Sequence, residues 1–151
     1  MILAPDLIDL LTELQSSGAE YLVVGGWAVG VHAEPRYTKD LDLLIGSSPT
    51  NLARVVDALT RYGAPAALVD QVRTMTPDEF VFFGVPPARV DLLRSIPGIE
   101  FEHAWTRRKD VRWGEVDVHV IGFDDLCLAK RAAGRRRDLD DLKLLERFRG
   151  A

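Results

Sequence analysis

The sequence predicts an α/β fold in which a short mixed sheet is flanked by helices. Short runs of β-favouring residues alternate with longer segments whose apolar residues recur at helical spacing. The chain has 151 residues, of which 47% are apolar and 28% charged, the balance of one ordinary globular domain. We therefore expect a single domain over residues 1–151, with no internal repeat and no low-complexity linker.

In the N-terminal half, helical patterns alternate with two short strands. Leucines recur at helical spacing after Pro5, and Gly18 and Gly63 lie where helices are expected to end. Pro35 requires the helix before it to stop. The expected elements are a helix between Pro5 and Gly18, a strand over 21–24, a helix over 27–32, a strand over 41–45 and a helix over 51–62.

In the C-terminal half, two strand pairs are followed by two helices. Pro86-Pro87 favours a bend between two extended runs, and Gly114 favours a turn between two others. The expected elements are strands over 80–85 and 88–93 in one hairpin, strands over 111–113 and 115–121, and helices over 123–133 and 139–148. We expect the last two helices, at about 123–148, to close a cleft.

Composition excludes several classes of protein. The formal net charge of -4 argues against a general nucleic-acid coat protein, because binding to phosphate backbones needs many Lys and Arg side chains. The only cysteine, Cys127, lies among apolar residues and is expected to be a small buried hydrophobe. Neither a secretory leader nor a membrane span is indicated, so we expect a cytoplasmic protein.

Asp40 and Asp42 lie at the start of the strand expected over residues 41–45. Residues two apart on a strand project from the same face, with Cα atoms about 6.5 to 7 Å apart, so the two carboxylates can share one metal site. Leu41 between them points into the core. The alternative interpretation is a pair of solvated acids at the start of a strand.

Asp91 supplies a third acid within the apolar run 88–93. A carboxylate in such a run is costly to bury unless it is paired or bound to a metal. The sequence leaves two partners open, a metal ion shared with the other acids or a salt bridge to Arg89 or Arg94.

Gly25-Gly26 separates the strand over 21–24 from the helix that follows it. Glycine lets backbone N–H groups approach a phosphate without obstruction by a side chain, and the helix N-terminus adds partial positive charge. The pair is therefore a candidate anion site. The alternative is an ordinary turn that needs glycine only for its backbone conformation.

Two sets of residues resemble the nucleotidyltransferase superfamily, in the branch that contains AbiEii-type toxins and small antibiotic nucleotidyltransferases. The first set is Gly25-Gly26-Trp27-Ala28-Val29, His32, Pro35-Arg36, Thr38 and Asp40-Leu41-Asp42. The second set, which resembles the elements that close the domain in toxin-like members, is Lys130, Arg135, Arg137-Asp138 and Asp141-Leu142.

The resemblance implies a polymerase beta-like nucleotidyltransferase fold and a set of roles at the site. Two Mg²⁺ ions, or Mn²⁺, would be held by three acids, with Asp91 also the base for the incoming hydroxyl; the metal-binding and catalytic residues are Asp40, Asp42 and Asp91. A nucleoside triphosphate such as ATP would be bound by the remaining set, which is Gly25, Gly26, Arg36, Thr38 and Lys130. For Lys130, a solvated position on an amphipathic helix is the alternative.

The implied reaction transfers a nucleoside monophosphate to a hydroxyl group and releases pyrophosphate. The acceptor is left open between an RNA such as tRNA, a partner protein and a small molecule, and the toxin-like branch implies a place in a toxin–antitoxin system. Two basic clusters, at 107–109 and 135–137, are candidate docking points for a phosphate-rich acceptor. The alternative from another class is a non-catalytic module that binds a nucleotide or a partner.

Overall fold

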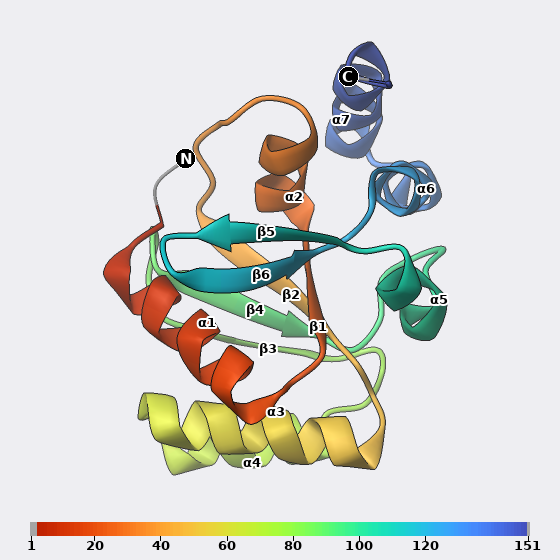
Figure 1. Cartoon of the computed structure of the whole chain (residues 1–151). Coiled ribbons are helices and arrows are strands. Elements are labelled where there is room, and N and C mark those ends of the chain that lie inside the picture. The colour runs from red at the N-terminus through yellow and green to blue at the C-terminus, as the bar shows by residue number, and fades with distance from the viewer. Residues whose placement is uncertain (1–2, 151) are drawn as a thin grey trace.

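The computed structural model describes residues 3–150, which form a sheet covered by helices on both faces (Figure 1). The helices are α1 (Pro5–Ser17), α2 (Gly25–His32), α3 (Pro49–Tyr62), α4 (Ala66–Thr74), α5 (Phe101–Thr106), α6 (Phe123–Ala133) and α7 (Arg136–Arg147). The strands are β1 (Tyr21–Val24), β2 (Asp40–Ile45), β3 (Phe80–Phe83), β4 (Arg89–Leu93), β5 (Lys109–Trp113) and β6 (Val116–Val120).

The sheet has six strands in the order β3-β4-β2-β1-β6-β5 and is mixed. The central strands β1 and β2 are antiparallel, β2 is parallel to β4, and β1 is parallel to β6. Antiparallel partners add the two edges, since β3 pairs with β4 and β5 pairs with β6. The predicted mixed sheet flanked by helices is confirmed, and so are both predicted strand pairs.

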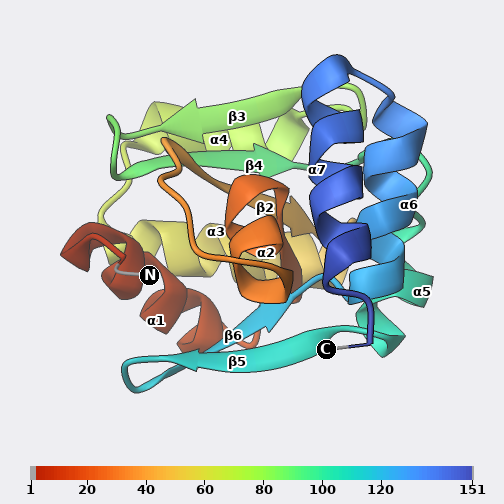
Figure 2. The same cartoon turned by 90° about the horizontal axis from the view of Figure 1, so that it is seen from above.

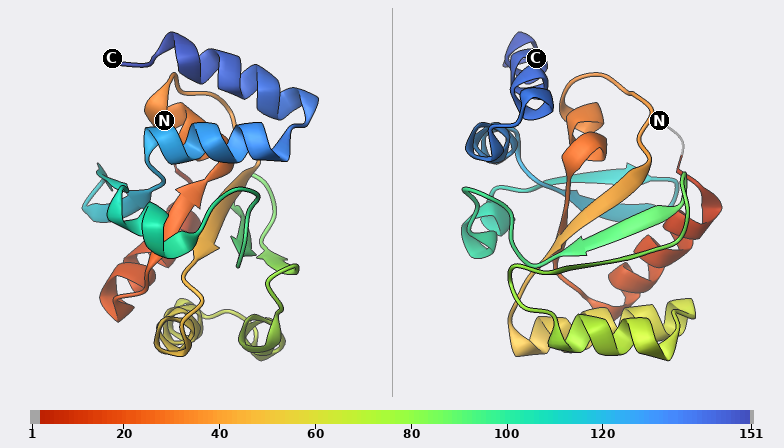
Figure 3. Two further views of the ribbon diagram at one scale, coloured as in Figure 1. Left: turned by 90° about the vertical axis from the view of Figure 1, so that its right-hand side faces the viewer. Right: turned by 180° about the vertical axis from the view of Figure 1, so that it is seen from behind.

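The two faces of the sheet carry different helices. Helices α1, α3 and α4 lie on one face, and α2, α6 and α7 lie on the other, as the views from the side and from behind show (Figures 1 and 3). Every residue of β1 is buried, because the centre of the sheet is covered on both sides. Cys127 on α6 is buried, as its apolar neighbours predicted.

Some boundaries differ from those expected from the sequence. Helix α2 begins at Gly25, two residues before the expected start, so both glycines belong to its first turn. Helix α7 begins at Arg136 instead of residue 139, because Arg135 and Asp138 form a capping box there. The sequence patterns did not predict α4 or α5. No helix within residues 3–150 combines the length and the apolar character needed to cross a membrane.

Candidate active site

Three carboxylates meet on the face of the sheet that carries α2, α6 and α7. Strands β2 and β4 run parallel, with Asp42 directly opposite Asp91 and Asp40 opposite Arg89. In each strand the intervening residues are buried, so alternation turns the acids to the open face. One oxygen from each of Asp40, Asp42 and Asp91 lies within 4.8 Å of the other two.

The charges of this cluster are only partly compensated. Burial first, and then the neighbouring charges of Asp91 and Asp40, raise the pKa of Asp42 to about 7. The Arg89 guanidinium donates a hydrogen bond of 2.9 Å from Nε to Asp91 and lies 3.6 Å from Asp40. Within residues 3–150 Asp42 has no salt bridge. An added cation would therefore relieve the repulsion mainly at Asp42.

The donor set fits a hard divalent cation. Mg²⁺ and Mn²⁺ prefer oxygen ligands, and the cluster offers three carboxylates and no nitrogen or sulfur donor. The acids are half-buried, which leaves them open to solvent and to a substrate on one side. The sequence left a metal ion and an arginine as alternative partners for Asp91. The two are compatible, because Arg89 contacts the same carboxylate that lies in the acid cluster.

The N-terminus of α2 lies against this cluster. Gly25 has φ +67°, and a Cβ atom built there would overlap the carboxylate of Asp42. A Cβ atom at Gly26 would lie 2.7 Å from Cγ2 of Thr38. Helix α2 has no side-chain cap among the described residues, so the N–H groups of its first turn remain available to a ligand. Glycine is required here for close approach as well as for backbone conformation.

A network of charges, built on three mostly buried side chains and two partly exposed arginines, joins the loop before β2 to the C-terminal helices. Arg36 donates two hydrogen bonds to Asp141, of 2.6 and 3.1 Å. The Lys130 ammonium lies 2.9 Å from Asp141 and 3.5 Å from Asp138. Arg135 donates to Asp138 from Nε at 2.6 Å. Burial would raise the pKa of Asp141, but hydrogen bonds from Arg36 and Lys130 hold it below its ordinary value.

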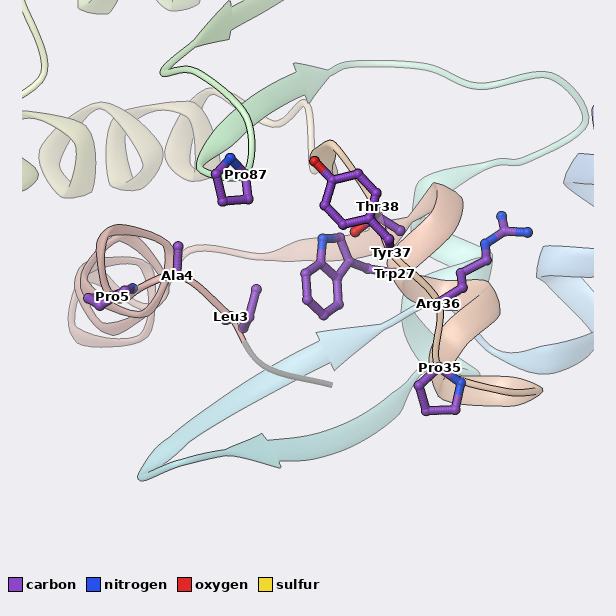
Figure 4. Close-up of a pocket in the computed structure, with 9 residues that line it drawn as sticks. All are labelled: Leu3, Ala4, Pro5, Trp27, Pro35, Arg36, Tyr37, Thr38 and Pro87. Atoms are coloured by element: carbon purple, nitrogen blue, oxygen red, sulfur yellow. The ribbon is translucent and has the colours of Figure 1, made fainter.

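Two pockets lie near the first turns of α2. A pocket of about 140 Å³ extends from the acids toward the C-terminal helices, where Gly25, Asp42 and Lys130 line it. A second pocket, of about 560 Å³, has Trp27 and Thr38 in its wall. Figure 4 shows that Arg36, although it borders this second pocket, extends away from Trp27 toward the C-terminal helices.

A comparison with known protein families shows the family to which the chain belongs. A family model matches residues 5–146, and the family is described as "Nucleotidyltransferase of unknown function (DUF6036)". The chain belongs to this family. No curated protein matches the chain. The predicted membership of the nucleotidyltransferase superfamily is confirmed, whereas the narrower branch of AbiEii-type toxins and antibiotic enzymes stays a prediction.

Six of the eight predicted site residues of this nucleotidyltransferase fall into two groups. Asp40, Asp42 and Asp91 lie together, with Gly25 against Asp42. A second group connects through Asp141, which binds both Arg36 and Lys130. Thr38 joins neither group through a side-chain hydrogen bond, because its buried Oγ1 has no partner in the described chain.

One interpretation from the sequence of the nucleotidyltransferase is wrong, and several site residues were missed. Lys130 is not a solvated helix position, because its side chain is only 12% exposed and is paired with two acids. Asp138 and Asp141 were seen in the sequence motif without a role. Arg89 was considered only as a partner for Asp91, although the parallel register also places it beside Asp40.

The two basic clusters of the nucleotidyltransferase are partly used within the chain. Arg107 donates two hydrogen bonds of 3.0 Å to the buried Asp125. Arg135 is the N-cap residue of α7 and is bound to Asp138. These two arginines therefore help to hold α6 and α7 in place, and their donors are less available to an acceptor.

Proposed function

We propose that this nucleotidyltransferase moves a nucleoside monophosphate from a nucleoside triphosphate to a hydroxyl group, with Mg²⁺ or Mn²⁺ held by Asp40, Asp42 and Asp91. The observation that carries the proposal is the contact between Gly25 and the Asp42 carboxylate. It brings the uncapped first turn of α2, which favours phosphate, directly beside the acids, which favour metal ions. A metal-bound triphosphate needs both of these at one place.

We assign the triphosphate to the first turn of α2 and to Lys130. An ammonium group has three N–H donors, and Asp138 and Asp141 account for two of those on Lys130. The remaining donor is available to a phosphate in the pocket that Lys130 shares with Gly25 and Asp42. Arg36 acts through Asp141, since both of its terminal nitrogens are bound there, and so holds Lys130 in position.

Two divalent ions would offset the charge of the triphosphate and hold the attacking and leaving oxygens in line. In the proposed step the acceptor oxygen forms a bond to the α-phosphorus while the bond from that phosphorus to the bridging oxygen of pyrophosphate breaks. Asp91 takes the proton of the hydroxyl. Because positioning and electrostatics dominate such chemistry, the reaction needs no nucleophilic Ser, Cys or His.

Label transfer tests this proposal. The protein is incubated with Mg²⁺, with each nucleoside triphosphate labelled at the α-phosphate, and with tRNA, short RNA, cell protein and small hydroxyl compounds as separate acceptors. We expect label in one acceptor class and none in the presence of a chelator. A parallel reaction uses triphosphate labelled at the γ-phosphate, and label transfer in that reaction alone would identify a kinase. Absence of transfer to every class in both reactions would favour a non-catalytic binding module.

The acceptor that receives the label also tests the proposed place in a toxin–antitoxin system. If the protein is a toxin with nucleotidyltransferase activity, the expected acceptor is RNA. If it is an antitoxin with that activity, the expected acceptor is its partner protein. Label confined to a small molecule would oppose both roles.

A further inference from the structure

Four residues form a continuous row across the open face of the sheet. Val24 is opposite Asp42, Asp42 is opposite Asp91, and Asp91 is opposite Phe82. Residues directly opposite each other in neighbouring strands project from the same face. The row therefore runs from the start of α2, which follows Val24, across the acids to an aromatic ring on the edge strand β3.

Strand β3 presents two aromatic rings on this face. Phe80 and Phe82 are 52% and 53% exposed, with ring centroids 6.2 Å apart, and we call them the Phe platform. Val81 between them is buried in the core. Seen from above, α2 lies at the middle of the view and α6 and α7 lie at its right, and they leave β3 uncovered over most of its length (Figure 2). The platform is therefore open to solvent.

An arginine joins the Phe platform to the acids. The Arg89 guanidinium carbon lies 4.1 Å from the centroid of the Phe82 ring, and the same side chain donates to Asp91. One face of Phe82 thus carries a planar cation that is fixed by the candidate base. The platform is continuous with the site and is not a separate apolar patch.

The exposed Phe platform leaves the acids open to an acceptor from the β3 end of this row. The triphosphate, as proposed above, lies at the α2 end, where Gly25 and Lys130 line the small pocket. In-line displacement needs the acceptor hydroxyl on the opposite side of the α-phosphorus. That side of the row is the one where Asp91 is followed by Phe82.

We propose that the Phe platform stacks nucleobases at the end of a single-stranded RNA, which makes RNA ends the acceptor class. This inference rests on the proposed nucleotidyl transfer. Exposed aromatic rings beside an arginine are the elements on which single-stranded bases stack, and two rings match one or two terminal nucleotides. A net charge of -4 is compatible with this short footprint, because stacking needs few phosphate contacts.

Binding of a short RNA measures the platform without requiring catalysis. A fluorescent RNA hexamer with a free 3′-hydroxyl is titrated with the protein, with Mg²⁺ and without nucleotide, and anisotropy is recorded. Replacing both rings, Phe80→Ala with Phe82→Ala, should weaken binding by about tenfold or more, because loss of each stacked base has a measurable cost. The double change to tyrosine keeps both rings and should bind as the wild type does.

Leu139→Ala is the matched control, because Leu139 is a comparably exposed apolar side chain that lies on α7 and not on β3. Circular dichroism melting checks the fold of every variant, and nucleoside triphosphate affinity should be equal in all of them. Wild-type affinity in the double alanine variant would overturn the inference. A wild-type protein that binds no RNA would also overturn it. So would label transfer that goes only to a protein or a small molecule and whose rate the alanine changes do not alter.

The two proposals fail in different ways. RNA binding that depends on the rings, together with absence of label transfer to any acceptor, would overturn the nucleotidyl transfer and leave the platform standing. Label transfer to a protein partner at an unchanged rate in the double alanine variant would support the nucleotidyl transfer and overturn the role of the Phe platform.

Discussion

Asp42→Asn should abolish nucleotidyl transfer, with a loss of about a thousandfold or more, because it removes the charge of the central metal ligand. Asp42 is opposite Asp91 in the sheet, and its carboxylate lies against Gly25 in the first turn of α2. No neighbouring carboxylate can therefore take its place. Asparagine has nearly the same shape, and the fold should be retained. The measurement is the initial rate of label transfer with Mg²⁺ in excess.

The same variant should be more stable than the wild type when metal is absent. Burial and the charges of Asp91 and Asp40 raise the pKa of Asp42 to about 7, so the folded protein retains a proton that the unfolded chain releases at lower pH. Stability contributed by the protonated carboxyl is therefore lost as pH rises toward and through 7. At pH 8 with a chelator, Asp42→Asn should melt above the wild type.

Asp70→Asn is the control for both measurements, since Asp70 is an exposed acid on α4 far from the cluster. It should change neither the transfer rate nor the melting temperature. Full activity in a folded Asp42→Asn protein would remove Asp42 from the metal site. A lower melting temperature at pH 8 would show that the carboxylate stabilises the fold as a structural ion.

Gly25→Ala should reduce transfer nearly as strongly. The added methyl group would overlap the Asp42 carboxylate, and alanine at φ +67° is strained in addition. The carboxylate must move, the turn must open, or both, and either change separates the phosphate site from the metal site. We expect the rate of label transfer to fall by about a hundredfold or more, as it does when positioning at a reacting centre is lost.

Gly114→Ala separates strain from overlap. Gly114 has φ +65°, close to that of Gly25, but an added Cβ atom there would meet no other atom within 4 Å. Gly25→Ala should lose more stability than Gly114→Ala, because it adds the overlap with Asp42 to a similar backbone strain, and only Gly25→Ala should lose activity. Equal activity in the two variants would mean that Gly25 serves the turn alone.

The sequence predicted the centre of the site because local patterns specify it. Alternation along β2 places Asp40 and Asp42 on one face with Leu41 buried, and this depends only on the strand period. The glycine pair after β1 was likewise interpreted as a candidate anion site from its position between a strand and a helix. The first turn of α2 was assigned as a turn, because glycine has a low helix propensity and packing overrides it here.

Contacts between distant parts of the chain were beyond the sequence patterns. Arg36 and Asp141 are 105 residues apart, and their pairing depends on how α7 packs over α2. Phe82 lies beside the acids only through strand order, because its position opposite Asp91 requires β3 to pair with β4 in one particular register. A sequence pattern predicts the face on which a residue projects, and the sheet order decides its neighbours.

The central claim is that the three acids hold a divalent cation against a triphosphate, and calorimetry of nucleotide binding tests it most directly. A nucleoside triphosphate is titrated into the wild type, Asp42→Asn and Asp70→Asn, each with Mg²⁺ and with a chelator. The account predicts tight binding with Mg²⁺ and weak binding with the chelator for the wild type and Asp70→Asn, and weak binding under both conditions for Asp42→Asn. Equal affinity with and without Mg²⁺ in the wild type, or Mg²⁺-dependent binding that survives in Asp42→Asn, would contradict it.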